Sequence, residues 1–306
     1  MKNWLPTITE QKKRTISVAV RVILTGIAIW FVARKVNLPL FSSIILNLEW
    51  SWFLVAVGAW LLSRLAAGWR TGCLLNGYGL RLAPVTNMKL MFKSSLYNTV
   101  LPGGITGDAV KGIYLHRWGS LTPKKIIMLL AIDRGSGLWA VLVLLAALLV
   151  FKISAGDFRF FFWGAGFLSL SLYMKWLLMR WLQAPVGHFF WNITVASLCV
   201  QLLQVAGSFF TLRSMQVTAG TIDYLFAFLV SSLASVIPVS VGGAGVREVT
   251  FVLIEPWMGS TYVIETGVAL GLLLFLINLL SVLPGLFLKL PDPGSEVTLV
   301  ARETTP

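Results

Sequence analysis

Charged side chains are scarce in this chain of 306 residues, at 12% of the total, against roughly 25% in soluble globular domains. Hydrophobic residues reach 57%, and the mean hydropathy is +0.82. These values exclude an ordinary soluble domain and predict a polytopic membrane protein. Acidic residues are the scarcest, with 12 against 25 basic ones and a formal net charge of +13. This excess is typical of cytoplasmic loops and of surfaces that face anionic lipids, and no nucleic-acid-binding motif accompanies it.

Histidine and cysteine are also nearly absent. Two histidines, His116 and His188, are too few for a His-rich metal site, and we expect neither a metal nor a cofactor. Two cysteines, Cys73 and Cys199, lie far apart in or beside apolar segments and predict buried thiols rather than a disulfide. No G-x-x-x-x-G-K-[ST] loop is present. Any energy source would therefore be an ion gradient, the membrane potential or the gradient of the substrate itself.

Six apolar runs are long enough to span a bilayer, for which about 20 residues are needed. The first run follows a basic start but ends without a small-residue cleavage pattern, which predicts an uncleaved helix rather than a signal peptide. Basic residues before the first run and between the second and third runs place both chain ends in the cytoplasm, although Arg34 and Lys35 fall on the opposite side. The predicted spans are 16–33, 50–68, 126–150, 158–181, 189–211 and 262–288.

Two further apolar segments, 88–118 and 222–257, are interrupted by Pro and Gly near their centres. Irregular backbone at membrane depth is tolerated only where it is buried in protein or lines a wet cavity. Each segment therefore predicts two half-helices joined by a Gly-rich break, the first entering from the cytoplasm and the second from the other side. The predicted fold is all-α, with about six spanning helices and two re-entrant, broken helix pairs.

The domain organisation follows from this pattern. Residues 1–290 are interpreted as a single transmembrane domain with repeat-like halves at about 50–150 and 186–290. Residues 291–306 are polar and contain Pro, which predicts a disordered cytoplasmic tail.

The sequences of the two breaks resemble each other and are interpreted as two copies of one motif. The sequences "LPGGITGDAVKG" (101–112) and "IPVSVGGAGVRE" (237–248) align without a gap when Pro102 faces Pro238. Each copy then ends in Val followed by a cation, Lys111 or Arg247. Such interruptions in corresponding places of two halves indicate a transport site between inverted repeats. The rival interpretation is chance similarity between sequences of low complexity.

The residue types in each copy favour anion binding. Pro ends the incoming half-helix, and the glycines permit close approach of a ligand to the backbone. The outgoing half-helix is predicted to begin near Gly107 or Gly243, where its free N–H groups attract anions. A cation follows within its first turn. Two opposed half-helix starts with two cations therefore predict a phosphate cradle.

Several ionisable residues have a structural interpretation beside the functional one. Asp133 and Arg134 lie some eight residues into the third span, where ionisable groups usually face a bundle interior or a cavity, and a structural ion pair is the rival. Asp108 could be a helix N-cap, and Lys111 and Arg247 could extend to the interface.

Glu248 directly follows Arg247, and adjacent residues do not face each other on a helix. We therefore expect Arg134 or Lys111 to be the partner of Glu248. Basic residues interpreted as interfacial are Arg21, Arg64, Lys175 and Arg180. The predicted transport-site residues are Asn98, Pro102, Gly103, Gly104, Gly107, Asp108, Lys111, Asp133, Arg134, Pro238, Gly242, Gly243, Gly245, Arg247 and Glu248.

The combined motifs, Asn98…LeuProGlyGly…GlyAsp…Lys, then Asp133-Arg134…Gly137, then IlePro-Val-Ser…Gly-Ala-Gly-Val-Arg-Glu, resemble the membrane portion of bacterial lysylphosphatidylglycerol synthases over roughly residues 15–290. In the two-part relatives this region is associated with moving the modified lipid between leaflets, and a separate soluble domain performs aminoacyl transfer. No such domain is recognised in this sequence. The resemblance therefore implies lipid translocation in the bacterial inner membrane rather than synthase activity.

Three functions remain open from the sequence. The leading one is a translocator for an anionic phospholipid or a polyprenyl-phosphate-linked lipid, with that lipid as its partner and no nucleic acid. The second is an integral-membrane transferase that modifies a lipid head group. The third is a small-solute secondary transporter. The sequence leaves the oligomeric state open.

Overall fold

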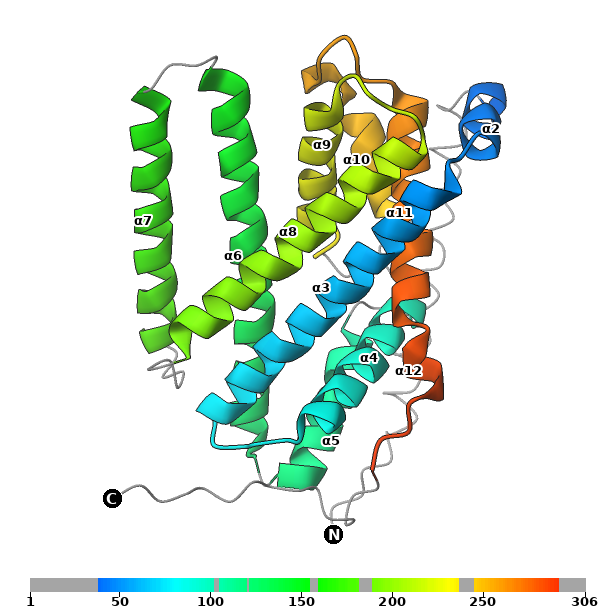
Figure 1. Cartoon of the computed structure of the whole chain (residues 1–306). Coiled ribbons are helices and arrows are strands. Elements are labelled where there is room, and N and C mark those ends of the chain that lie inside the picture. Colours follow the sequence, from blue (N-terminus) through cyan, green and yellow to red (C-terminus); the bar gives the residue numbers. More distant parts are fainter. Residues whose placement is uncertain are drawn as a thin grey trace, which may run out of the picture.

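The computed structural model describes residues 38–101, 105–119, 121–154, 159–181, 189–236 and 245–291, and every regular element within them is a helix (Figure 1). The chain is an all-α polytopic membrane protein, as the sequence predicted. The α-helices are α2 (Leu38–Leu46), α3 (Trp50–Gly77), α4 (Pro84–Val100), α5 (Thr106–Gly119), α6 (Pro123–Ser154), α7 (Arg159–Trp181), α8 (Phe190–Ser214), α9 (Thr221–Ala234), α10 (Val246–Leu253), α11 (Ile264–Val282) and α12 (Pro284–Phe287), and a 3-10 helix, η1, covers Glu255–Trp257.

Four of the described helical segments are long and apolar enough to cross a membrane. They are Trp50–Gly77, Pro123–Lys152, Phe190–Ser214 and Ile264–Phe287, and each contains one of the predicted spans or most of it. Helix α7 matches the predicted span 158–181 in its bounds but is not one of the four. The predicted span 16–33 and the predicted tail lie outside the described residues, except for Pro291.

Helix α3 continues well beyond its predicted end at residue 68. It stops at Gly77, where Gly79 adopts a left-handed backbone (φ +80°) and Leu80 N–H donates to the carbonyl oxygen of Leu75 at 3.0 Å. A glycine in this conformation is a common helix terminator because it lacks a Cβ that would collide with the backbone. The extra turns bring Arg70 and Thr71 into the bundle.

Helices α3 and α8 form the central scaffold and lie side by side across the bundle (Figure 1). Small residues make this close approach possible. The indole of Trp60 on α3 is 1% exposed and packs against Gly207 on α8, where a Cβ would collide with the ring. Ala56 is also fully buried along this seam.

The two broken helices are arranged as hairpins at opposite ends of the bundle. Helix α4 runs inward from the lower end of Figure 1, and α5 packs beside it and returns to that end. Helix α9 runs inward from the upper end, and α10 returns. Helix α5 begins at Thr106, next to the predicted start at Gly107, and α10 begins at Val246, three residues after Gly243. That each hairpin re-enters a membrane, and that the two are symmetry-related, stay predictions.

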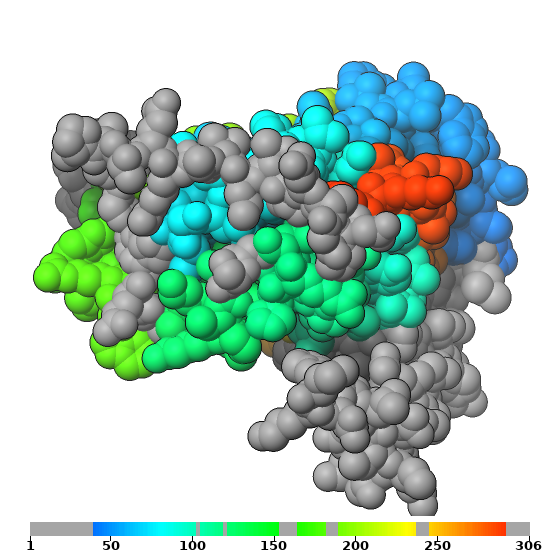
Figure 2. All heavy atoms as spheres, turned by 90° about the horizontal axis from the view of Figure 1, so that it is seen from below, coloured from blue at the N-terminus to red at the C-terminus, as the bar shows by residue number. Residues whose placement is uncertain are grey.

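The lower end of the bundle carries exposed basic side chains. Seen from that side, α5 and the start of α6 form the middle of the face, and α12 lies at its edge (Figure 2). Exposed basic residues of this end are Arg81, Arg117, Lys124, Lys125 and Lys289. Their grouping agrees with a cytoplasmic position for this end by the positive-inside rule, which stays a prediction.

Candidate functional site

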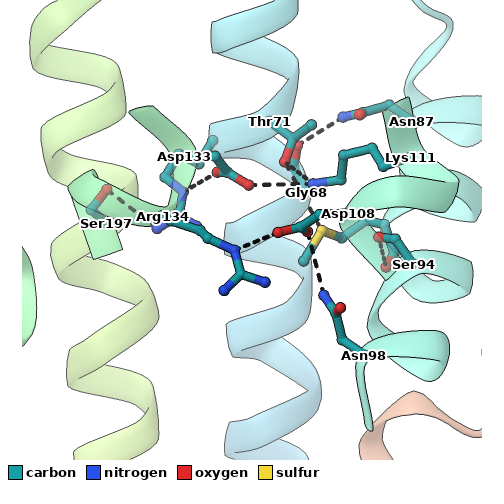
Figure 3. A network of polar contacts seen from close by, with 12 residues as sticks. Gly68, Thr71, Asn87, Ser94, Asn98, Asp108, Lys111, Asp133, Arg134 and Ser197 are labelled. Atoms are coloured by element: carbon teal, nitrogen blue, oxygen red, sulfur yellow. Dashed lines mark hydrogen bonds and ion pairs between the residues drawn. The ribbon is translucent and has the colours of Figure 1, made fainter. Parts of the chain in front are cut away.

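Two ion pairs join the first turns of α5 to the middle of α6 (Figure 3). Asp108 and Lys111 lie three residues apart on α5 and therefore share one face of that helix. Asp108 pairs with Arg134 Nε, and Lys111 Nζ lies 3.3 Å from Asp133 Oδ2. The adjacent residues Asp133 and Arg134 of α6 thus bind a cation and an anion of α5, respectively.

Asp133 is shared between two cations. Arg70 Nε lies 2.8 Å from Asp133 Oδ1, on the other side of the carboxylate from Lys111. Lys111 Nζ also donates to Thr71 Oγ1 at 3.4 Å, and Arg70 Nη1 donates to Ser197 Oγ at 3.5 Å. This buried network connects α3, α5, α6 and α8. With Lys111 only 2% exposed, the interpretation that it extends to the interface is wrong.

The start of α5 is capped from α4. Asn98 Oδ1 accepts a hydrogen bond from Gly107 N–H at 2.8 Å, and Asn98 Nδ2 donates to Asp108 Oδ1 at 3.4 Å. Asp108 therefore orients the capping amide and holds Arg134, while Asn98 provides the cap to Gly107 itself. Gly107 sits against the Ser94 carbonyl, and any Cβ there would collide with that oxygen. The close contact explains why the sequence has glycine at this position.

The start of α10 is capped from within. Gly245 adopts φ +85°, and its N–H donates to Glu248 Oε2 at 2.7 Å, which is the reciprocal half of a capping box. The prediction that Glu248 pairs with Arg134 or Lys111 is wrong, because a carboxylate three residues into a helix reaches its own N-terminus more easily than a distant cation. Glu248 is 3% exposed, and its Oε1 has no hydrogen-bond partner among the described residues.

A cavity of about 280 Å³ lies between α6, α8, α9 and α10. Among the described residues its polar lining consists of Arg134, Gln201, Gln204, Ser232 and Arg247. Two guanidinium groups therefore line one space, Arg134 from the helix that holds α5 and Arg247 from the first turn of α10. Gln201 is 8% exposed, and its Oε1 has no partner among the described residues.

Arg247 also lies near a second arginine. The guanidinium carbons of Arg247 and Arg64 are each 5.8 Å from the ring centroid of Trp60. Arg64 donates to Asn278 Oδ1 and, from Nε, to Ser281 Oγ at 3.4 Å, both on α11. These partners are neutral, and no carboxylate of the described chain lies within ion-pair distance of either arginine.

Sequence reasoning missed Arg64 and Arg70. Arg64 lies near the end of the predicted span 50–68, and Arg70 lies beyond it. On the sequence alone, both are therefore interpreted as cations near the membrane interface. The interpretation of Lys175 as interfacial is also wrong. Its side chain is buried, with Nζ 2.9 Å from Thr194 Oγ1 and 4.2 Å from the centroid of Trp139. One signal was available: each cation lies inside or beside an apolar run with few other charges.

Six predicted site residues fall on the two breaks themselves. Pro102, Gly103, Gly104, Pro238, Gly242 and Gly243 lie outside the described residues. The structure describes the helices on both sides of each break.

Residues 18–195 match the family model described as lysylphosphatidylglycerol synthase TM region, which is more than half of the chain. The chain belongs to this family. The match includes α3 to α7 and the first broken helix, and it ends within α8, before the second one. Among curated proteins no significant match is found. The protein is thus a multi-pass membrane protein of the lysylphosphatidylglycerol synthase TM region family.

Proposed function

We propose that this protein moves a phosphate-bearing lipid between the leaflets of the bacterial inner membrane. The head group would pass through the polar cavity between α6, α8 and the second broken helix, α9 and α10, while the acyl or prenyl tails stay in the bilayer. The substrate class is an anionic phospholipid or a polyprenyl-phosphate-linked lipid. No bond is made or broken in this proposal, and the energy source would be an ion or lipid gradient or the membrane potential.

The observation that carries the proposal is the shared cavity of Arg134 and Arg247. An ionised guanidinium inside a membrane protein is costly unless it has a charged partner or faces a wet cavity. Planar guanidinium groups match phosphate oxygens well, because two parallel N–H donors can bind one phosphate. The position of Arg247 in the first turn of α10 adds the positive end of the helix dipole.

The surroundings of the cavity fit a lipid. Large apolar side chains are exposed on the outer helices, among them Leu170 and Trp181 on α7 and Leu253 on α10. Such surfaces favour contact with lipid tails. The family description names an enzyme of phospholipid modification, and this supports a lipid as the substrate at a coarse level.

The proposal is tested by reconstituting the protein in liposomes with labelled anionic lipids and following their accessibility from the outer leaflet. The wild type should accelerate exchange without nucleotide. Arg247→Gln should slow exchange by about tenfold or more, because a charge-assisted hydrogen bond contributes roughly 1.5–3 kcal/mol. Arg180→Gln is the matched control, since Arg180 is exposed and stacks on Trp176 at 5.3 Å.

Equal rates for wild type, Arg247→Gln and empty liposomes would contradict translocation. Chemical change of the lipid in the same assay would instead support the transferase alternative. Uptake of a soluble anion without lipid movement would support the small-solute transporter.

A further inference from the structure

The central ionisable cluster contains more cations than carboxylates. We define this cluster as the ion-pair network of α5 and α6 together with the arginines that line the cavity or flank Trp60. Its five cations are Arg64, Arg70, Lys111, Arg134 and Arg247. Its three carboxylates are Asp108, Asp133 and Glu248. The described part of the cluster therefore has an excess of two positive charges when all groups are ionised.

One excess positive charge lies where Asp133 is shared by Arg70 and Lys111, and the other lies on the side of Arg64 and Arg247. Asp108 balances Arg134, and Asp133 is shared by Arg70 and Lys111. Glu248 is the acid next to Arg247, but it bonds to Gly245 N–H and lies beyond ion-pair distance of the guanidinium.

Two other cations of the described chain, the exposed Lys152 and the buried Lys175, are compensated differently. Lys152 Nζ lies 2.6 Å from Asp223 Oδ1, so that pair is neutral. Lys175 faces the rings of Trp139 and Phe190 at 4.2 and 5.6 Å, where cation–π attraction stabilises the ammonium. Lys175 does not line the cavity. The unmatched excess is thus a property of the central cluster.

A membrane interior does not hold unbalanced charge cheaply. The cavity lined by Arg134 and Arg247, with Arg64 close to Arg247 at the Trp60 ring, therefore has a preferred ligand charge. We infer that the site takes a lipid head group carrying two negative charges, as a phosphomonoester or a diphosphate, in preference to a phosphodiester with one. This inference rests on the proposed function and narrows its substrate class.

The distinction separates lipids that differ little in shape. Phosphatidylglycerol is a phosphodiester with one charge at any neutral pH. The second pKa of a phosphomonoester is about 6, and neighbouring guanidinium groups favour the doubly ionised form. A lysyl ester of phosphatidylglycerol carries more ammonium groups than phosphate charges, so the same cluster would bind it weakly.

The test titrates the full chain in detergent with phosphatidic acid, phosphatidylglycerol and phosphatidylcholine that share the same acyl chains, and counts bound lipid by native mass spectrometry near neutral pH. Phosphatidic acid should bind about tenfold or more tightly than phosphatidylglycerol, on the scale of one additional charge-assisted contact. Phosphatidylcholine should bind weakest.

Substitutions test whether the preference for phosphatidic acid over phosphatidylglycerol depends on the charges of the cluster. Arg64→Gln removes one positive charge and should bring the two anionic lipids to within about threefold of each other, since the lost contact contributes on the order of tenfold. Arg64→Lys keeps the charge without the planar guanidinium and should retain most of the preference. Arg180→Gln, at an exposed position, should leave it unchanged.

Equal binding of the two anionic lipids by the wild type would overturn the inference, and this readout does not depend on any variant folding. A preference that persists in folded Arg64→Gln would overturn it as well. Selective binding without movement in liposomes would remove the translocation proposal and leave the charge preference standing. If inorganic phosphate binds as tightly as phosphatidic acid, the translocation proposal would likewise be removed and the charge preference would stand.

Discussion

Lys111 and Arg247 occupy matching positions in the two broken helices, each in the first turns of the outgoing half, and their surroundings differ. Lys111 is 2% exposed and is held by a carboxylate and a hydroxyl. Arg247 lines a cavity, lies over Trp60 and has no carboxylate within ion-pair distance in the described chain. The two aligned cations therefore have different surroundings in this fold. In the first hairpin Lys111 is held in a buried ion pair, and in the second Arg247 faces a cavity.

The largest expected effect comes from removing the carboxylate that fixes the first hairpin. Asp133→Asn leaves Arg70 and Lys111 buried without a counter-charge, which typically costs about 3–5 kcal/mol. Thermal unfolding in detergent should show this loss. Asp223→Asn is the matched control, because among the described residues Asp223 forms an ion pair with Lys152 alone. The Lys152 side chain is 35% exposed, and such a pair contributes about 1 kcal/mol. Similar losses for both variants would contradict the assigned role of the shared carboxylate.

The difference between Lys111 and Arg247 is tested by measuring both stability and lipid transport for a variant of each residue. Lys111→Gln should lower the free energy of unfolding by about 1.5–3 kcal/mol, the range for hydrogen bonds to charged groups. Arg247→Gln should leave stability unchanged or raise it, since it removes a partly buried cation that has no acidic partner within ion-pair distance among the described residues.

Lipid movement should show the opposite order when each rate is normalised to the folded fraction. Arg247→Gln should lose about tenfold or more, and Lys111→Gln should lose less. If stability and transport fall together in both variants, the two positions do not differ as the structure indicates.

A smaller effect is expected from the close contact inside the first hairpin. Gly107→Ala places a methyl group against the Ser94 carbonyl, and overpacking of this kind costs about 1–3 kcal/mol. Gly58→Ala on α3 is the control, because nothing lies within 4 Å of the added Cβ and Ala is favoured over Gly in helices by about 1 kcal/mol. The unfolding temperatures should therefore move in opposite directions.

The smallest effect concerns the two caps. Asn98→Ala removes the acceptor for Gly107 N–H, and loss of such a cap costs about 1 kcal/mol. Glu248→Gln keeps a carbonyl acceptor three residues into α10 and should change stability by less than that value. Unfolding measured on both variants in one detergent decides the order, and a larger loss for Glu248→Gln would mean that its charge has a further partner.

Local chemistry in the sequence was sufficient to place most of the long helices and the start of the helix after the first break, but it did not predict α2 or the full length of α3. Apolar runs placed α3, α6, α8 and α11, and the Pro-Gly-Gly stretch placed the start of α5 within one residue. The predicted list also contained Arg134 and Arg247, which line one cavity. Their role as a transport site stays a prediction.

The pairings could not be predicted in the same way. Arg70 and Asp133 are 63 positions apart in the chain, and their contact depends on how α3 continues past its apolar run and how α6 packs against it. Glu248 shows the reverse case. A distant partner was expected, yet Glu248 Oε2 accepts a hydrogen bond from the N–H of Gly245, the residue just before its own helix. Long-range ion pairs depend on packing, which hydropathy and spacing do not encode.

Arg134 belongs to two sites at once, because it pairs with Asp108 of α5 and lines the cavity. An anion that bound this guanidinium would share its donors and its positive charge with the Asp108 carboxylate. The two interactions are thermodynamically linked. If a bound anion weakens the Asp108–Arg134 ion pair by some factor, the ion pair weakens the binding of the anion by the same factor. Binding of an anion in the cavity would therefore change how firmly α5 is held to α6, and the strength of that attachment would change the affinity for the anion.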